Sequence, residues 1–227
     1  MSAFPEPMPL GASAADREGR ILSVSVDLDG LEHYYAIHGL TPSERADKVY
    51  TVALPRFLAM FEALGIRATF FAIGESLESP EAASMLARAR AAGHEIGNHT
   101  YHHRYDLVRL PDDELEAEIV RGDDAVKRAT GAGCMGFRAP GYNIDERVLA
   151  VCRKLGYRYD SSVFPSYPYY LAKATVMGAL RALGRPSRAA LGDPKVLAAP
   201  IHPYVPDIAN WRRRAPRPDG AFGSAAP

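Results

Sequence analysis

Residues 66–103 read IRATFFAIGESLESPEAASMLARARAAGHEIGNHTYHH, and this stretch decides the fold class. Its first nine residues, 66–74, are mostly apolar and aromatic, which predicts a buried strand. Residues 80–92 predict a helix that Gly93 ends, and residues 94–98 predict another short strand. A strand, a helix and a strand in so short a stretch indicate parallel strands joined by a helical crossover.

The same alternation of strands and helices continues on both sides of this stretch. Further strands are expected at residues 21–26, 135–138 and 157–159, and further helices at 44–65, 111–130, 144–155 and 170–184. Pro55 should kink or divide its helix, and Gly65 suits the end of that helix. The pattern predicts an α/β fold, either an open parallel sheet or a (β/α) barrel. After about residue 165 no clear strand pattern is found, and residues 203–227 are rich in Pro, Arg and Gly.

The composition is that of a globular protein with balanced charge. Hydrophobic residues make up 47% of the 227 residues, enough for a sizeable core. Lys plus Arg and Asp plus Glu both total 27, which argues against a nucleic-acid-binding protein. Residues 1–20 predict a flexible lead-in without the pattern of a signal peptide, and no stretch is apolar enough to span a membrane. We therefore expect a cytoplasmic protein in which Cys134 and Cys152 are free, buried thiols.

Two acidic residues follow the first expected strand. Asp27 and Asp29 stand two residues apart, so on an extended chain their carboxylates point to the same side. One can bind a metal ion while the other accepts a proton. Asp and Gly are also common turn formers after a strand, so this pair alone does not decide the function.

Histidines follow the strand expected at residues 94–98. His99 and His103 are four residues apart, so on a helical turn they would share a face and could bind one metal ion. Among the other early histidines, His94 and His102 are expected in structural roles. His33 and His38 fall in a loop expected after the first strand, where they either line the site or, as we favour, face water.

The last two expected strands also end in chemically capable residues. Arg138 precedes a rigid Pro-Gly turn, where it can hold a carboxylate in a fixed geometry or lie on the surface of the turn. Asp160 can orient another catalytic group or cap the turn that follows it. Because the carboxyl ends of parallel strands meet at one rim, all these segments should contribute to one site.

These motifs, in this order and at these intervals, resemble the polysaccharide deacetylases, carbohydrate esterases that share the NodB homology domain. The phrases GIRATFFAIG and GHEIGNHTYHH carry the resemblance most specifically, and it covers roughly residues 20 to 165. It implies a distorted (β/α) barrel whose C-terminal strands are missing or diverged here. The domain would span residues 21–205 and be followed by a Pro/Arg-rich tail at 206–227.

The resemblance also implies a metal site and a reaction. Asp29, His99 and His103 would bind one divalent metal ion, with zinc expected first and cobalt, nickel or iron as alternatives. The expected partner is an N-acetylated sugar or glycan, from whose nitrogen the enzyme would hydrolyse an acetyl group.

The resemblance assigns roles to further residues in turn. Asp27 would be the general base, and Arg138 would hold Asp27 in place. Asp160 would support the general acid, and Tyr142 would bind the substrate. In the family the acid is a late histidine, and His202 is the only late histidine of this sequence.

Two other classes of protein fit part of the pattern. Non-haem iron oxygenases also use two histidines and one carboxylate, although usually on β scaffolds. A non-catalytic deacetylase-like domain could bind a glycan or a partner protein without turnover. Five tyrosines are candidates for stacking on sugar rings in that case: Tyr157, Tyr159, Tyr167, Tyr169 and Tyr170.

Overall fold

The computed structural model describes residues 23–37, 48–164, 166–184, 191, 193 and 223–224. In this part of the chain, six short strands form one parallel sheet in chain order. The strands are β1 (Ser25–Asp27), β2 (Thr69–Ala72), β3 (Glu95–Asn98), β4 (Gly136–Phe137), β5 (Tyr159–Asp160) and β6 (Gly223–Ser224). The α-helices are α1 (Leu31–Ile37), α2 (Leu54–Leu64), α3 (Pro80–Ala91), α4 (Asp112–Thr130), α5 (Glu146–Lys154) and α6 (Tyr167–Ala182). The predicted α/β class with parallel strands is confirmed.

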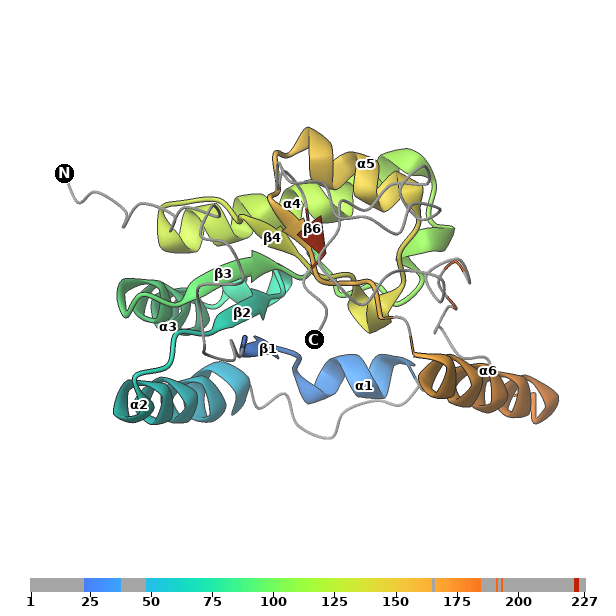
Figure 1. Cartoon of the computed structure of the whole chain (residues 1–227), viewed down its shortest axis with the longest axis horizontal. Coiled ribbons are helices and arrows are strands. Elements are labelled where there is room, and N and C mark those ends of the chain that lie inside the picture. The colour runs from blue at the N-terminus through green and yellow to red at the C-terminus, as the bar shows by residue number, and fades with distance from the viewer. Residues whose placement is uncertain are drawn as a thin grey trace, which may run out of the picture.

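The sheet is an arc whose neighbouring strands are consecutive along the chain (Figure 1). Consecutive parallel strands require crossovers, and α2 to α5 supply most of them. Within the described residues, β1 and β6 each pair with a single neighbour, so the arc is not closed there. The short β6 lies in the stretch where no strand was expected, because two residues such as Gly223–Ser224 carry no strand pattern.

Local signals fix most helix boundaries where they were expected. Pro55 does divide its helix, because a short π-helical turn at Val49–Ala53 precedes α2 and Pro55 stands in the first turn of α2. Gly65 ends α2 in the left-handed conformation, with φ of 64°. Asp145 caps α5, since its carboxylate accepts hydrogen bonds from two backbone N–H groups of the first turn.

The structure departs from the prediction most clearly at α1 and at β5. A loop was expected after β1, but the chain forms helix α1 at Leu31–Ile37, which is too short to give a periodic pattern. The last strand was expected to begin at Tyr157, but the N–H of Tyr157 donates to the carbonyl of Cys152 and still closes the end of α5. Strand β5 therefore begins two residues later, and Asp160 is its final residue rather than a residue beyond it.

The core consists of two apolar clusters, one under each half of the sheet. One is formed by β1 to β3 with α2 and α3, and it includes Leu54, Phe70 and Leu86. The other lies between β4, α4 and α5, and it includes Ile119 and Phe137. Both cysteines are free, as expected, but only Cys152 is fully buried, while Cys134 is half-buried. Burial raises the pKa of both thiols.

Some expectations fall on residues outside the described part. These are the lead-in at 1–20, His38, His202 and all of the tail at 206–227 except residues 223–224. Among the described helices, none is both long and apolar enough to cross a membrane. The cellular compartment stays a prediction.

Helix α4 approaches the end of β3 closely at Gly122. A Cβ atom at this position would lie 2.3 Å from Oδ1 of Asn98 and 2.9 Å from the carbonyl carbon of Thr100. Only a glycine allows the helix to lie this close to the segment that carries His99. This constraint could not be predicted from the sequence, because Gly122 stands inside a helical pattern.

We predict that Gly122→Ala destabilises the protein by about 1–3 kcal/mol, because the added methyl group overpacks a fixed backbone contact. Urea denaturation measures the effect. The matched control is Gly178→Ala in α6, where an added Cβ meets no atom within 4 Å. The control should be neutral or stabilising by up to ~1 kcal/mol, as usual for Gly→Ala in an open helix. Equal stability changes in both variants would contradict the close approach.

Candidate active site

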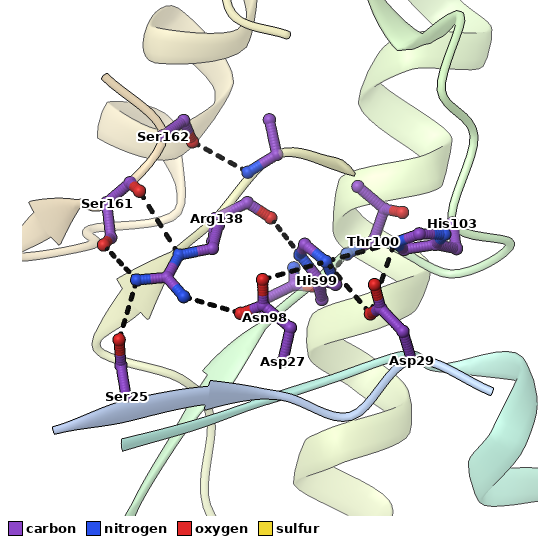
Figure 2. A network of polar contacts seen from close by, with 11 residues as sticks. Ser25, Asp27, Asp29, Asn98, His99, Thr100, His103, Arg138, Ser161 and Ser162 are labelled. Atoms are coloured by element: carbon purple, nitrogen blue, oxygen red, sulfur yellow. Dashed lines mark hydrogen bonds and ion pairs between the residues drawn. The ribbon is translucent and has the colours of Figure 1, made fainter. Parts of the chain in front are cut away.

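The carboxyl ends of β1, β3, β4 and β5 bring together the polar residues that the sequence placed after these strands. Figure 2 shows Asp27 and Asp29 facing His99 and His103, with Arg138 on the other side of Asp27. The segments are far apart along the chain, and the parallel sheet aligns their ends.

Three side chains converge on one point. Oδ1 of Asp29 lies 3.4 Å from Nε2 of His99 and 3.4 Å from Nε2 of His103. The two Nε2 atoms are 3.1 Å apart, and the three potential ligand atoms all lie within 4.8 Å of one another. One carboxylate and two imidazoles at such spacing match the donor set of a catalytic divalent metal site.

The hydrogen bonds around this triad suit a metal ion. Nδ1 of His99 donates to the carbonyl of Arg138 at 2.6 Å, so the lone pair of the neutral ring lies on Nε2, which faces the triad. Oδ1 of Asp29 is buried and has no hydrogen-bond partner among the described residues. A carboxylate oxygen without a hydrogen-bond partner that faces two imidazole nitrogens is an arrangement that a cation stabilises. These residues therefore fit the metal that the resemblance implies.

The pKa values reflect the same crowding. Burial opposes ionisation of Asp29, but contacts with His103 and His99 hold the pKa of Asp29 well below its ordinary value. Burial lowers the pKa of His103 to about 4, whereas the aspartates keep the pKa of His99 raised in spite of its burial. His103 is therefore neutral at pH 7, the state in which an imidazole can bind a metal ion.

The two histidines do not lie on a helical turn, so that part of the prediction is wrong. Thr100 and His103 both have positive φ, 66° and 54°. The backbone groups of this segment form hydrogen bonds with other elements and not within a helix. The N–H of Gly74 donates to the carbonyl of Thr100, and the N–H of Tyr101 donates to the carbonyl of Glu118. A left-handed threonine costs about 1–3 kcal/mol and persists only where its surroundings hold it.

Asn98, the last residue of β3, holds this strained segment. Its Oδ1 accepts a hydrogen bond from the N–H of Thr100 at 2.9 Å. Its Nδ2 donates to the carbonyl of Ile119 and to the hydroxyl of Tyr157, each at 2.8 Å. Asn98 was not among the predicted site residues, although its place at a strand end beside His99 was the available signal.

Arg138 is buried, and each of its three guanidinium nitrogens donates at least one hydrogen bond. Nη1 donates to Oδ1 of Asp27 at 2.6 Å, and Nη2 donates to the hydroxyls of Ser25 and Ser161 at 2.9 and 2.7 Å (Figure 2). The guanidinium also stacks over the ring of Phe71, 4.2 Å from its centroid. Of the two alternatives for Arg138, the structure shows the one in which it holds a carboxylate. Asp27 is thereby fixed with its Oδ2 4.0 Å from Nε2 of His99.

Asp160 makes the turn contacts expected of a cap. Oδ1 accepts from the hydroxyl of Ser162 at 2.5 Å, and Oδ2 accepts from the N–H of Ser162 at 2.9 Å. The Ser162 hydroxyl also accepts from the N–H of Ala139, which connects this turn to the segment after Arg138. Burial raises the pKa of Asp160 to about 6 in spite of these bonds.

Tyr142 lies beside the Arg138 guanidinium, whose Cζ is 5.9 Å from the ring centroid. The tyrosine adopts a left-handed conformation with φ of 58°, and burial raises its pKa. Its ring contacts those of Phe164 and Tyr169, with centroids 5.3 and 6.1 Å away. Tyr142, Phe164 and Tyr169 thus form one aromatic cluster, and Tyr142 is the member that lies beside Arg138.

The remaining histidines divide into two groups. His94 accepts from the N–H of Ala68, and His102 pairs with Glu118 at 2.5 Å, so both have the structural roles expected. His33 does not face water as expected. It lies in α1 with its ring centroid 4.8 Å from that of His103, and burial lowers its pKa. A helix directly after β1 turns it toward the site, and this short helix was not foreseen.

The polysaccharide deacetylase family model matches residues 46–159, half of the chain. The chain belongs to the polysaccharide deacetylase family. This membership leaves no reason to retain the oxygenase interpretation. The matched range includes His99, His103 and Arg138, while Asp27 and Asp29 precede it.

Curated relatives are deacetylases of several glycans. The chain is 27% identical over 158 residues to a peptidoglycan deacetylase of Helicobacter pylori, covering 66% of this chain and 53% of the relative. It is 32% identical over 95 residues to a peptidoglycan-N-acetylglucosamine deacetylase of Bacillus cereus, covering 42% of this chain and 34% of the relative. The chain thus spans about half the length of these relatives or less.

A solved structure supports the fold assignment. A Mycobacterium smegmatis protein assigned as a polysaccharide deacetylase superposes with a TM-score of 0.59 at 18% identity. The superposition covers 90% of this chain and 57% of that protein. At this identity it shows a shared fold only, and it is the deacetylase fold that the sequence implied.

We predict that the purified chain binds about one divalent ion and that Asp29→Ala and His103→Ala abolish this binding, since each removes one of three ligand atoms. Elemental analysis after dialysis against zinc measures the number of metal ions bound per chain. His102→Ala is the control, because His102 bonds Glu118 outside the triad. Retained metal in both triad variants would contradict the assignment.

We predict that Asp160 makes the protein less stable as the pH rises from about 4 to 6. Its folded pKa of about 6 exceeds the ordinary value of 3.8, so the unfolded chain releases the proton first. A difference of about two units between the folded and unfolded pKa values lowers the free energy of unfolding by about 3 kcal/mol at pH 7, relative to low pH. Urea titrations of Asp160→Asn and the unaltered protein should show the variant gaining in relative stability over this range. A constant difference between them would refute the raised pKa.

Proposed function

We propose that this protein is a metal-dependent hydrolase that removes the acetyl group from the nitrogen of an amino sugar in a glycan. The observation that carries the proposal is the Asp29–His99–His103 triad with Asp27 held beside it by Arg138. Relatives named as deacetylases of peptidoglycan and chitin support the same substrate class.

Asp29, His99 and His103 would hold the metal ion, and zinc is the ion we propose, because a carboxylate and two imidazoles suit it. When bound, such an ion acts as a Lewis acid and brings the pKa of a water molecule toward 7. The neutral state of His103 and the Nε2 lone pair of His99 leave both rings ready for ligation.

Asp27 is the general base of this proposal. Arg138 occupies its Oδ1, while Oδ2 faces the triad. The free oxygen is therefore placed to accept a proton from a water molecule that attacks the acetyl carbonyl. Because Arg138 is itself held by Ser25 and Ser161, the carboxylate keeps one orientation.

Asp160 acts in this proposal through the turn that it caps. Its two oxygens hold Ser162, while Arg138 bonds the neighbouring Ser161, so Asp160 supports the base rather than touching the substrate. Tyr142 would contact the sugar from the aromatic side of the site. His202 remains our candidate for the acid that protonates the departing amine, and it lies outside the described residues.

We predict acetate release from N-acetylglucosamine oligomers or from peptidoglycan fragments by the zinc-loaded chain. Asp27→Asn should lower the rate about 10²–10⁴-fold, the usual loss when a general base is removed. It should retain the metal ion, because Asp27 is not one of the three ligands. An enzymatic acetate assay and elemental analysis measure both quantities.

The control for this experiment is Asp112→Asn, an exposed aspartate in the first turn of α4 that should leave the rate unchanged. Metal bound without acetate release from any of these glycans would refute catalysis and favour a domain that only binds glycan. Full activity in Asp27→Asn would refute the role of Asp27 as the general base but not the deacetylase function.

A further inference from the structure

Helix α6 extends outward from the body of the protein (Figure 1). None of its described side chains is buried, and large apolar side chains such as Leu171 and Val176 are exposed. A helix with so little buried surface is not held by the core. Specific contacts near its beginning must therefore fix its position.

Lys173 makes the polar contact that joins α6 to the site. Its Nζ donates to the carbonyl of Gly141 at 2.9 Å and to Oδ1 of Asn143 at 2.9 Å. The side chain is partly buried, and burial lowers the pKa of Lys173 to about 8. An ammonium group withdrawn from water in this way forms strong, directional bonds with its acceptors.

The bonded carbonyl belongs to a strained peptide. Gly141 and Tyr142 are consecutive residues with positive φ, 60° and 58°. The peptide group between them is held from both sides, because the N–H of Tyr142 donates to Ala139 and the carbonyl of Gly141 accepts from Lys173. A tyrosine keeps such a conformation only where its surroundings fix it.

Asn143, the second acceptor of Lys173, is connected to the triad through Tyr105. Nδ2 of Asn143 donates to the carbonyl of Tyr105 at 2.7 Å. The ring of Tyr105 packs edge-on against that of His103, with centroids 4.8 Å apart. Lys173 thus lies at the outer end of two short chains of contacts, one to Tyr142 and one to the His103 side of the site.

We propose that Lys173 is a positioning residue for substrate binding, which fixes Tyr142 and the α6 residue Tyr169 as one aromatic wall for the sugar. The proposal rests on the proposed function. Tyr169 contacts both Tyr142 and Phe164, and Nζ of Lys173 lies 5.9 Å from its ring centroid. One lysine therefore aligns the turn and the helix that carry this wall.

The kinetic test compares Lys173→Met with Lys173→Arg in acetate release from N-acetylglucosamine oligomers. Lys173→Met should raise KM about tenfold, as expected for the loss of charge-assisted hydrogen bonds, and change kcat less than about twofold. Lys173→Arg retains charged donors and should restore most of the affinity. Arg181→Met, which alters an exposed cation on the same helix, should change neither constant. An unchanged KM, or a parallel loss of kcat and metal, overturns the proposal.

Hydrogen exchange tests the same role without any turnover. The amides of Tyr142 and Asn143 should exchange about tenfold faster in Lys173→Met, because the turn that contains them loses its outer support. Arg181→Met should leave them unchanged. If the unaltered protein releases no acetate, the proposed function fails while exchange still measures the positioning. Equal exchange in Lys173→Met and the unaltered protein overturns the role of Lys173.

Discussion

The buried guanidinium of Arg138 imposes the constraint on which the site depends. Removing a cation from water costs several kcal/mol unless its donors are satisfied. Here the partners come from β1, where Ser25 and Asp27 accept, and from the turn after β5, where Ser161 accepts. The strands can satisfy Arg138 only at one register, so the ion pair also sets where the carboxyl ends of the sheet stand. The same hydrogen bonds of Arg138 therefore both place the base and align the strands.

A second constraint concerns the histidine segment. A helix would place His99 and His103 on one face without strain, yet this segment adopts a left-handed conformation at Thr100 and His103. Asn98 fixes the segment by accepting a hydrogen bond from the N–H of Thr100. Gly122 lets α4 approach so closely that the carbonyl of Glu118 accepts a hydrogen bond from the N–H of Tyr101. The strain places both Nε2 atoms opposite the carboxylate of Asp29. Rigidity of this kind keeps metal ligands in place before the ion arrives.

The two sides of the site differ in how they are held. The metal side consists of buried groups supported by the core of the sheet. The aromatic side includes α6, which has no buried residues and relies on Lys173 and a few ring contacts. In such an arrangement the metal-binding side chains stay in place, while the aromatic side chains on the less rigidly held side can adjust to a polymeric substrate.

The sequence by itself determined the α/β class, the order of the elements and which strand ends carry reactive groups, because these depend on local periodicity and on helix-ending glycines such as Gly65. The resemblance further named the three residues of the triad. Tertiary structure alone decided that His33 faces His103, that Asn98 holds the segment around Thr100 and that Asp160 caps its own turn. It also decided that Lys173 supports the strained peptide before Tyr142. The reason is physical: His33 and Lys173 meet partners that are 70 and 32 positions away in the chain. The short contacts of Asn98 and Asp160 depend on backbone angles that neighbouring elements impose.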